Sequence, residues 1–581
     1  MECSNSPAIG MHASDHAAPT RHISRSIKTA KWCIILATCL LAAVPYVAGY
    51  WTSSPQYQFQ GAVDYVPDVQ SYFMWMRSAA DHAGLPPNLY HTTPEQPRFF
   101  HLLWWGLGKI SRFSGLSITF LYHSAHLLGA VLFLLSLWRF VGRFFSNPRP
   151  ACVAFGVCCL GSGLGWYTLI VDPSLPPILR SKPALPLVSL DLWSADVNTF
   201  YSILACPHYA IALWLLIEAL DRLYRSILGG PSRLCVSGAF YTLSLGFVHV
   251  YDMFLVAPLA LVFSIVWVMS ERRHSASEVP RCVAALTRGA SFVLAAILPV
   301  LFYAIATAQS PSLASWAKQN VLPTPGPHLY LQAFGLPGAL MLSYWQACRR
   351  IRRGEPEILF LVCWVGTVFL IMYSYPLLPF AKRVAEGIQI PVVILAIRCL
   401  YDQWIPWAKT RLGASKRHGI VLAAISVGLL IPTTLFLVCN ATIGTTSRQH
   451  PFFVTGDERA AFDRLNQHGD KAKGVLAPWQ TANIIPRYTG MMVYVGHPHL
   501  TPDYKTRRRL AHKFLWGYMD KSAMQQFLAK NRIGYLWLGR HKSRYAGSFP
   551  FDSGLFRVWF RSGFVNVHEV TDVGRGAPVG K

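Results

Sequence analysis

The strongest constraint on the fold is a series of apolar segments that are long enough to cross a lipid bilayer. A membrane-spanning helix needs about 20 predominantly apolar residues. Such segments lie at residues 32–50, 117–138, 150–171, 199–221, 233–249, 253–270, 286–307, 328–347, 356–376, 388–405 and 419–441. Lipid offers no hydrogen-bond partners to a peptide backbone, so we expect each segment to be helical. The sequence therefore predicts a mainly α-helical protein, a polytopic membrane bundle of about 11 transmembrane helices.

The composition excludes a soluble or a disordered chain. Apolar residues make up 52% of the sequence and charged residues only 14%, whereas soluble domains carry about 25% charged residues. The formal net charge of +26 would suggest a nucleic-acid partner in a soluble protein. Here we assign it to basic loops that set membrane orientation and to contacts with membrane lipids, and we predict no nucleic-acid partner.

The placement of Lys and Arg predicts how the bundle is oriented. Basic residues cluster in the N-terminal tail and in the loops near 139–149, 222–233, 272–281, 349–353 and 409–417. Counted along eleven spans, all these clusters fall on one side of the membrane, and cytoplasmic loops are enriched in basic residues. We predict a multi-pass protein of the cell (inner or plasma) membrane, with its N-terminus inside and its C-terminus outside.

This topology divides the chain into three parts. They are a cytoplasmic tail (1–31), a transmembrane domain (32–441) with an acidic first outer loop (51–116), and an extracytoplasmic domain (442–581). In the last part we expect helices at 457–468, 503–517 and 521–531 and strands at 474–477, 492–496 and 534–539. This alternation predicts a small α/β domain. All thirteen cysteines precede residue 445, so no disulfide is expected there.

The first outer loop contains the first candidate site residues. Asp64 and Asp68 lie four positions apart, a spacing that puts both on one face if the segment is helical. A carboxylate at an apolar boundary can serve as a general base, although a helix cap or a surface ion pair has the same pattern. Glu95 and Arg98 follow in the same loop, just before a segment at 98–112 that we interpret as an interfacial helix.

Polar residues also lie at the outer ends of later spans. The pair Asp196 and Asn198 precedes His208, and His249 and Asp252 form the short turn between two apolar segments. Charged residues at membrane level tend to mark function. A packed, hydrogen-bonded histidine and a polar helical hairpin are the structural alternatives for these two groups.

The segment before residue 388 contains a basic pair on the side where such residues are rare. Lys382 and Arg383 are placed to hold a phosphate at the lipid–water boundary, and Glu386 is expected to orient Arg383 by an ion pair at i, i+3. Snorkelling of both basic side chains to the interface is the alternative interpretation.

Several common catalytic motifs are absent from the sequence. It has no Walker A loop, no GxGxxG after a strand, no HExxH and no GxSxG elbow, so no nucleotide site is visible. It also has no Cys/His cluster with zinc spacing. We therefore predict no certain cofactor and no metal ligands; a divalent metal is possible but not indicated.

The order of these features resembles the GT-C superfamily, membrane glycosyltransferases that use polyprenyl-phosphate sugars, and in particular the protein mannosyltransferase and aminoarabinose transferase type. The resemblance rests on the acidic first outer loop, on the segments at 93–95, 196–200, 207–208 and 383–391, and on Val475-Leu-Ala-Pro, Tyr494-Val-Gly-His497 and Thr501-Pro-Asp503. It implies a glycosyltransferase with a lipid-linked sugar donor. It also implies that Asp64 or Asp68 activates the acceptor, and Asp64 aligns better with the acid of that family. The sequence lacks the adjacent acidic pair of the family, so both residues stay candidates.

The resemblance and the residues together predict transfer of a hexose or pentose on the extracytoplasmic face to an unknown acceptor, which could be a glycan, a lipid or a protein. The alternative is a secondary transporter or a flippase for lipid-linked sugars. Transporters often show internal repeats and charges near the midplane, whereas this sequence shows no repeat and places its charges at one face. A non-catalytic assembly or sensor protein is a third possibility.

Overall fold

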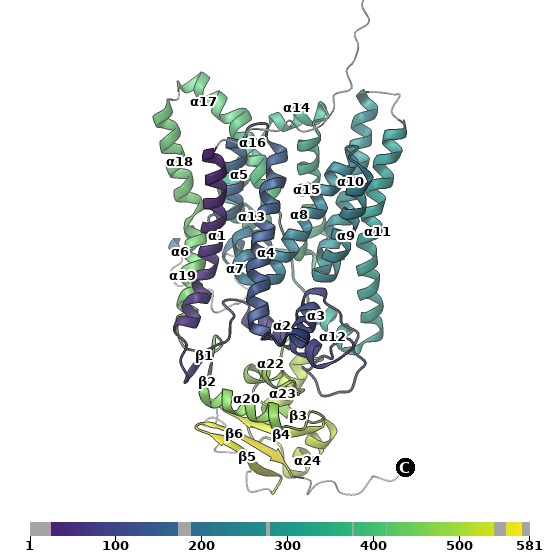
Figure 1. Ribbon diagram of the computed structural model, residues 1–581, viewed down its shortest axis with the longest axis vertical. Helices are drawn as coiled ribbons and strands as arrows, with labels where there is room; N and C mark the ends of the chain where they lie inside the picture. Colours follow the sequence, from purple (N-terminus) through teal and green to yellow (C-terminus); the bar gives the residue numbers. More distant parts are fainter. Residues whose placement is uncertain are drawn as a thin grey trace, which may run out of the picture.

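The structure is a computed structural model, and it describes residues 25–171, 188–274, 279–374, 377–413, 415–539 and 554–571. Figure 1 shows a bundle of long helices with a small α/β domain attached at one end. The first helix starts at the end of the bundle that lies away from this domain. Most of the predicted tail 1–31 lies outside the described residues, and the part from Arg25 belongs to the first helix.

The bundle consists of long helices and shorter connecting helices. The long ones are α1 (Arg25–Trp51), α4 (Ile118–Val141), α5 (Pro148–Leu160), α8 (Pro207–Ile227), α9 (Ser232–Val248), α10 (Met253–His274), α11 (Val279–Gln309), α13 (Pro327–Leu342), α15 (Pro356–Met372), α16 (Gln389–Cys399), α18 (Lys416–Leu430) and α19 (Pro432–Thr446). The shorter ones are α2 (Val66–Asp81), α3 (Leu102–Ser114), α6 (Gly165–Val171), α7 (Thr199–Ala205), α12 (Pro311–Gln319), α14 (Gln346–Arg352) and α17 (Ile405–Leu412). Single turns are η1 (Gly142–Phe144), η2 (Leu190–Leu192), η3 (Ala195–Val197), η4 (Val250–Asp252), η5 (Ala381–Ala385) and the wider turn η6 (Leu400–Trp404).

The mainly helical prediction is confirmed, and several expected spans are broken. The segment predicted at 199–221 forms two helices: α7 ends at Ala205 and α8 begins at Pro207. The break occurs because Cys206 precedes a proline and has an extended backbone. The segment at 419–441 is divided into α18 and α19 at Ile431, but Ile431 keeps helical angles and residues Arg417–Thr446 still count as one span. The segment at 150–171 breaks between α5 and α6. The expected interfacial helix corresponds to α3.

Among the described residues, six helices are long and apolar enough to cross a membrane, or seven if the bent pair α14–α15 counts as one span. Helix α8 carries Glu218, Asp221 and Arg222, and α16 has only 11 residues, so neither meets this measure. The count of eleven spans and the inside–outside orientation therefore stay predictions.

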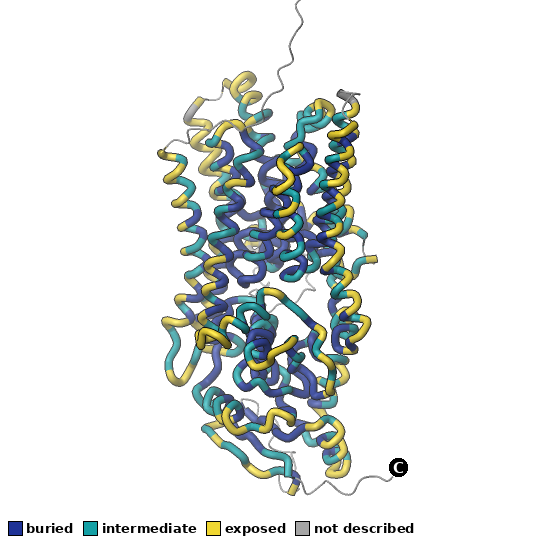
Figure 2. The backbone as a smooth tube through the Cα atoms, turned by 45° about the vertical axis from the view of Figure 1, so that its right-hand side comes forward, coloured by how far each residue is buried: buried dark blue, intermediate teal, exposed yellow. Residues whose placement is uncertain are grey.

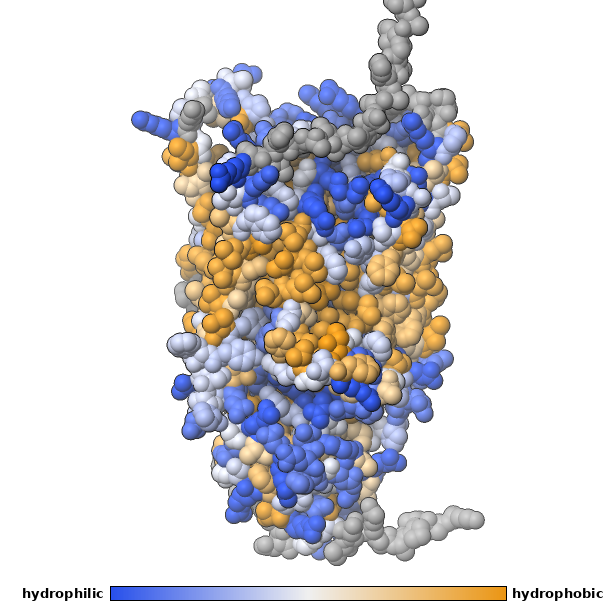
Figure 3. Space-filling view, in the orientation of Figure 1, coloured by the Kyte–Doolittle hydropathy of each residue, from blue (hydrophilic) through white to orange (hydrophobic). Residues whose placement is uncertain are grey.

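The surface of the bundle has the character of a membrane protein. On α11, Leu294, Leu298 and Leu301 recur at helical spacing and are 65%, 56% and 51% exposed, as on a lipid-facing stripe. Figure 3 shows a broad apolar band across the middle of the visible face, with polar residues gathered at both ends. Figure 2 shows the complement, a buried centre with exposed residues on the outer helices.

The C-terminal domain is built on one four-stranded sheet. Its strands are β3 (Gly474–Leu476), β4 (Ile533–Leu538), β5 (Phe556–Ser562) and β6 (Val565–Val570), in the order β3-β4-β6-β5. Strands β3 and β4 are parallel, and the other two pairs are antiparallel. Its helices are α20 (Gly456–His468), α21 (Trp479–Ala482), α22 (Ile485–Thr489), α23 (Tyr504–Leu515) and α24 (Lys521–Lys530).

The expected helices of this domain and two of its three strands are present. The third, at 492–496, is reduced to one bridge between Val475 and Val493. The β5–β6 hairpin was not predicted.

A second, smaller sheet ties the loop after α1 to this domain. Strand β1 (Tyr57–Phe59) pairs antiparallel with β2 (Phe453–Thr455). Nearby, Arg487 of α22 donates to the backbone oxygen of Gln60 at 2.7 Å and lies 3.6 Å from the centre of the Phe73 ring. The C-terminal domain is thus held against α2, which positions its loops over the end of the bundle.

Candidate functional site

A cavity of about 240 Å³ lies where the bundle meets the C-terminal domain. Its walls come from α2, the turn between α9 and α10, α12, η5 and the loop 497–500 of the C-terminal domain. Of the predicted site residues, four line it: Asp68, His208, His249 and Arg383. The cavity therefore brings together residues that are far apart in the sequence.

Asp68 lies in the first turn of α2 and is paired with a histidine of the C-terminal domain. The ring of His497 accepts hydrogen bonds at Nδ1 from the backbone N–H groups of His499 and Leu500, at 3.2 and 3.3 Å. Its proton is therefore on Nε2, which donates to Asp68 Oδ1 at 3.0 Å. Partial removal from water raises the pKa of Asp68, but the hydrogen bond from His497 and the positive charge of Arg383 outweigh this, so the pKa lies below its usual value. Asp68 is thus ionised at neutral pH, and its side chain remains 41% exposed.

Asp64 lies outside this cavity wall. The expectation that it shares a helix face with Asp68 is wrong, because α2 begins only at Val66 and Tyr65 has a positive φ of 45°. The Asp64 carboxylate accepts from the hydroxyl of Tyr201 and from the backbone N–H of Tyr65. Removal from water raises its pKa in spite of these two bonds.

The two basic residues of η5 lie in different surroundings. Arg383 lines the cavity, and its guanidinium lies 5.2 Å from the centre of the Tyr251 ring. The Lys382 ammonium is buried, 4.0 Å from the Trp193 ring centre and 3.9 Å from Asp196 Oδ2. Burial lowers the pKa of Lys382 to about 8.

Glu386 does not form the expected ion pair with Arg383. The chain turns away after η5, and Glu386 Oε2 lies 3.0 Å from Nδ1 of His249 instead. The same Nδ1 lies 3.0 Å from Oδ2 of Asp252. Glu386 and Asp252 are both fully buried directly behind the cavity wall.

The remaining candidates lie around the cavity or away from it. Asn198 caps α7 by accepting from the N–H of Tyr201, and His208 packs on Tyr72 with ring centres 4.9 Å apart. Glu95 accepts from the hydroxyl of Ser310 at the start of α12. Arg98 is exposed to solvent.

The sequence led us to expect that the C-terminal domain covers the cavity, but it did not single out the residues that this domain contributes. His497 and His499 were not predicted as site residues, although His497 lies in one of the segments that carry the resemblance. Two further lining residues that were missed are Tyr251 and Asn320. The side-chain amide of Asn320 donates a hydrogen bond to the hydroxyl oxygen of Tyr251 at 2.6 Å. The adjacent histidines in Gly496-His-Pro-His499 were the available signal.

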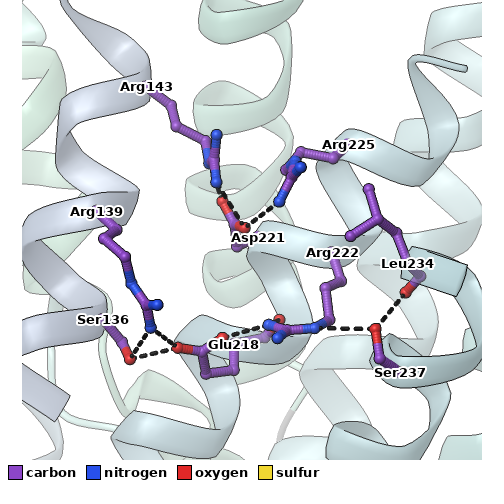
Figure 4. Close-up of polar contacts among 9 residues, drawn as sticks. All are labelled: Ser136, Arg139, Arg143, Glu218, Asp221, Arg222, Arg225, Leu234 and Ser237. Atoms are coloured by element: carbon purple, nitrogen blue, oxygen red, sulfur yellow. Dashed lines mark hydrogen bonds and ion pairs between the residues drawn. The ribbon is translucent and has the colours of Figure 1, made fainter. Parts of the chain in front are cut away.

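A second polar cluster lies in the half of the bundle away from the C-terminal domain (Figure 4). Glu218 of α8 is paired with Arg139 and Arg222, and Asp221 is paired with Arg143 and Arg225. Figure 4 shows Arg139 of α4, Arg143 of η1 and the two arginines of α8 pointing toward these two carboxylates. Each acid is matched by two cations, so we interpret the cluster as a structural clamp between α4 and α8.

Comparisons at the level of sequence identify no relative: no family model and no curated protein matches the chain. At the level of structure, the chain is similar to the archaeal oligosaccharyltransferase AglB from Archaeoglobus fulgidus in complex with an inhibitory peptide and a dolichol-phosphate. The TM-score is 0.51 and the identity 12%, over 96% of this chain and 76% of that one. The oligosaccharyltransferase of the same organism tethered to an acceptor peptide gives a TM-score of 0.51 at 12% identity, over 91% and 72%.

At this level of identity the similarity concerns the fold. It extends over nearly the whole chain and includes both the helical bundle and the attached C-terminal domain. The chain therefore shares the fold of this archaeal oligosaccharyltransferase, in agreement with the resemblance to the GT-C superfamily.

Proposed function

We propose that this protein is an integral membrane glycosyltransferase that transfers a sugar from a polyprenyl-phosphate donor to an acceptor on the extracytoplasmic face of the cell membrane. The single observation that carries the proposal is the cavity in which an ionised carboxylate, Asp68, and a guanidinium, Arg383, face the same space. A transferase of this class needs a base for the acceptor and a cation for the departing phosphate.

The reaction follows from these two groups. The acceptor hydroxyl oxygen attacks the anomeric carbon of the donor sugar and forms the new glycosidic bond. The bond between that carbon and the phosphate oxygen breaks, and the phosphate leaves with the electron pair. The hydroxyl proton goes to the Asp68 carboxylate. Arg383 stabilises the negative charge on the leaving polyprenyl phosphate.

Asp68 suits the role of base better than Asp64. It lines the cavity as an ionised carboxylate, whereas Asp64 lies outside the cavity wall and already accepts a hydrogen bond from the Tyr201 hydroxyl. We propose that Asp64 holds the turn before α2 and thereby positions Asp68.

The lipid-phosphate donor is supported by the chemistry of η5 and by the similar fold. The AglB structure is a complex with a dolichol-phosphate, which is a polyprenyl-type lipid phosphate, and with a peptide. In this chain, Lys382 adds a second positive charge next to Arg383. The sugar, a hexose or a pentose, and the chemical class of the acceptor are not assigned.

The other predicted binding residues support the site from outside the reacting centre. We propose that His208 and His249 shape the cavity wall and that Asp196 orients Lys382. Asn198 and Glu95 fix the starts of α7 and α12, while Arg98, which is exposed, is available to the lipid headgroups.

The test is a transfer assay with the full-length protein in lipid nanodiscs. The donor is a polyprenyl-phosphate-sugar fraction extracted from membranes of the native host and radiolabelled in the sugar. The readouts are release of polyprenyl phosphate and movement of label to a second molecule. We expect Asp68→Asn to slow single-turnover transfer by about 10²–10⁴-fold, the usual contribution of a general base.

Asp81→Asn is the matched control, because Asp81 lies at the other end of α2 and pairs with Arg77 outside the cavity. It should keep the wild-type rate. Full rate in both Asp68→Asn and Arg383→Ala would contradict the proposal. Movement of labelled lipid across a vesicle bilayer without release of phosphate would instead identify a flippase.

A further inference from the structure

We propose that His249, Asp252 and Glu386 form a binding site for a divalent transition-metal cation such as Mn²⁺ or Zn²⁺. His249 and Asp252 come from the turn between α9 and α10, and Glu386 comes from the loop between η5 and α16. The proposal goes beyond the transferase function and does not depend on it, because it rests only on the geometry and burial of these three side chains.

The three side chains converge on one point. Nδ1 of His249 lies 3.0 Å from an oxygen of Asp252 and 3.0 Å from an oxygen of Glu386, and one ligand atom from each residue lies within 4.8 Å of the others. Metal–ligand bonds to nitrogen and carboxylate oxygen are about 2.1 Å long. Two such ligands at a right angle lie about 3.0 Å apart, and at the tetrahedral angle about 3.4 Å apart. The observed spacing fits neighbouring ligands of one ion.

Contacts within the protein do not satisfy these groups. Asp252 and Glu386 are 0% exposed and His249 is 6% exposed. Within the described part of the chain, the four carboxylate oxygens and both ring nitrogens make no hydrogen bond of acceptable geometry. Nδ1 carries at most one proton, so a charged imidazole can donate from this atom to only one of the two carboxylates. A cation at this point would bind both carboxylates and the nitrogen at once.

The local charge also favours a cation. Nearby cations already have a partner or another role, because Lys382 lies against Asp196 and Arg383 faces Tyr251 and the cavity. Two buried carboxylates that share a single imidazole as their counter-ion are costly in an apolar interior. A divalent ion would neutralise both charges.

The ligand set indicates which kind of ion fits. Imidazole nitrogen suits Zn²⁺ and other transition metals, while carboxylate oxygens also suit Mn²⁺. A set of one nitrogen and two carboxylates therefore favours Mn²⁺ or Zn²⁺ over Mg²⁺ or Ca²⁺, which prefer oxygen alone. His249 and Asp252 are three positions apart, but Glu386 lies 134 positions after Asp252, which explains why sequence spacing did not reveal the site.

The experiment titrates the full-length protein in nanodiscs with Mn²⁺ alone, after treatment with a chelator, and follows the ion by electron paramagnetic resonance. We expect one bound Mn²⁺ per chain with a nitrogen coupling from an imidazole ligand. His249→Gln should remove the nitrogen coupling. Asp252→Asn and Glu386→Gln should each weaken binding by more than about tenfold, since even outer-shell partners of a metal contribute 10–100-fold.

Glu95→Gln is the matched control, because Glu95 lies 3.5 Å from His91 without a third ligand. It should bind Mn²⁺ like the wild type. Wild-type protein that binds no ion, or binding that is unchanged in all three ligand variants, would overturn the proposal.

Thermal unfolding provides a second readout that does not depend on a correctly loaded ion. In the presence of chelator, Glu386→Gln should unfold at a higher temperature than the wild type, because it removes one of two buried carboxylates that share a single imidazole. With Mn²⁺ the order should reverse, because only the wild type is stabilised by the ion. An identical order under both conditions would overturn the proposal.

Discussion

Replacing His497 by alanine removes the hydrogen bond that the C-terminal domain donates to Asp68 over 3.0 Å. If His497 acts by holding the Asp68 carboxylate ionised and oriented, its loss should slow sugar transfer even though His497 need not touch the acceptor. A hydrogen bond to a charged group contributes about 1.5–3 kcal/mol. The Asp68 side chain is 41% exposed, so water can replace part of the lost bond, and we expect the lower end of this range. At about 1.4 kcal/mol per factor of ten, the transfer rate should fall about tenfold.

The pH dependence gives this prediction its sign. The His497 bond lowers the pKa of Asp68, so the basic form persists to lower pH in the wild type. Without the bond the pKa of Asp68 rises. When the pH is lowered, the His497→Ala variant should therefore lose activity at a higher pH than the wild type does. His497→Gln keeps an N–H donor. It should restore part of the transfer rate and move the pH below which activity is lost part of the way back to the wild-type value.

A double-mutant cycle in the single-turnover assay separates this mechanism from a general loss of structure. If His497 acts through Asp68, adding His497→Ala to Asp68→Asn should cost almost nothing further. An equal loss of rate in both backgrounds, or an acidic limit that does not move, would refute the reasoning and make His497 a packing residue.

Four further outcomes are expected. Arg383→Ala should weaken donor use about tenfold to a hundredfold, and Arg383→Lys should keep part of it because the charge survives without the bidentate fork; an unchanged donor affinity in the Ala variant would contradict this. Donor binding should weaken as the pH rises through about 8, where Lys382 loses its proton, and Lys382→Arg should abolish that limit in a binding titration. Asp64→Asn should lower the rate far less than Asp68→Asn, since only Asp68 lines the cavity; the reverse order would make Asp64 the base. Glu218→Gln should lower the unfolding temperature, because it leaves Arg139 and Arg222 with a weaker partner, while the initial transfer rate at low temperature stays the same.

The helical content and the site region could be predicted because they depend on local patterns. Apolar segments of bilayer length predicted the positions of α4 and α10 to within a few residues. They also predicted the end of α11, although that helix starts earlier than expected. Charged residues on the outer side of such segments are rare, so Asp68 and Arg383 stood out as candidates. Both line the cavity.

The pairing of these residues could not be predicted, because it depends on how loops fold back. The i, i+3 spacing suggested that Glu386 would contact Arg383, but the loop after η5 directs Glu386 to His249. The positive φ of Tyr65 likewise separates Asp64 from the helix that bears Asp68. The turn at Tyr65 has no strong local signature, since Tyr65 is not a glycine or an asparagine.

The β5–β6 hairpin was missed for a related reason. The burial of β5 is irregular, with Arg557 and Val558 both exposed and a bulge that shifts its register against β6. An interrupted alternation removes the period-2 pattern by which a strand is recognised.

The bond between Asp68 and His497 also has a consequence for the time at which the protein becomes active. The two residues are 429 positions apart, and ribosomes add about 5–20 residues per second. The acid therefore emerges roughly 20–90 seconds before its partner histidine. During that interval the first outer loop also lacks its second strand, since β1 pairs with β2 after the last helix of the bundle. A nascent chain thus has an unfinished cavity, and under the proposed function transfer can begin only when synthesis is nearly complete.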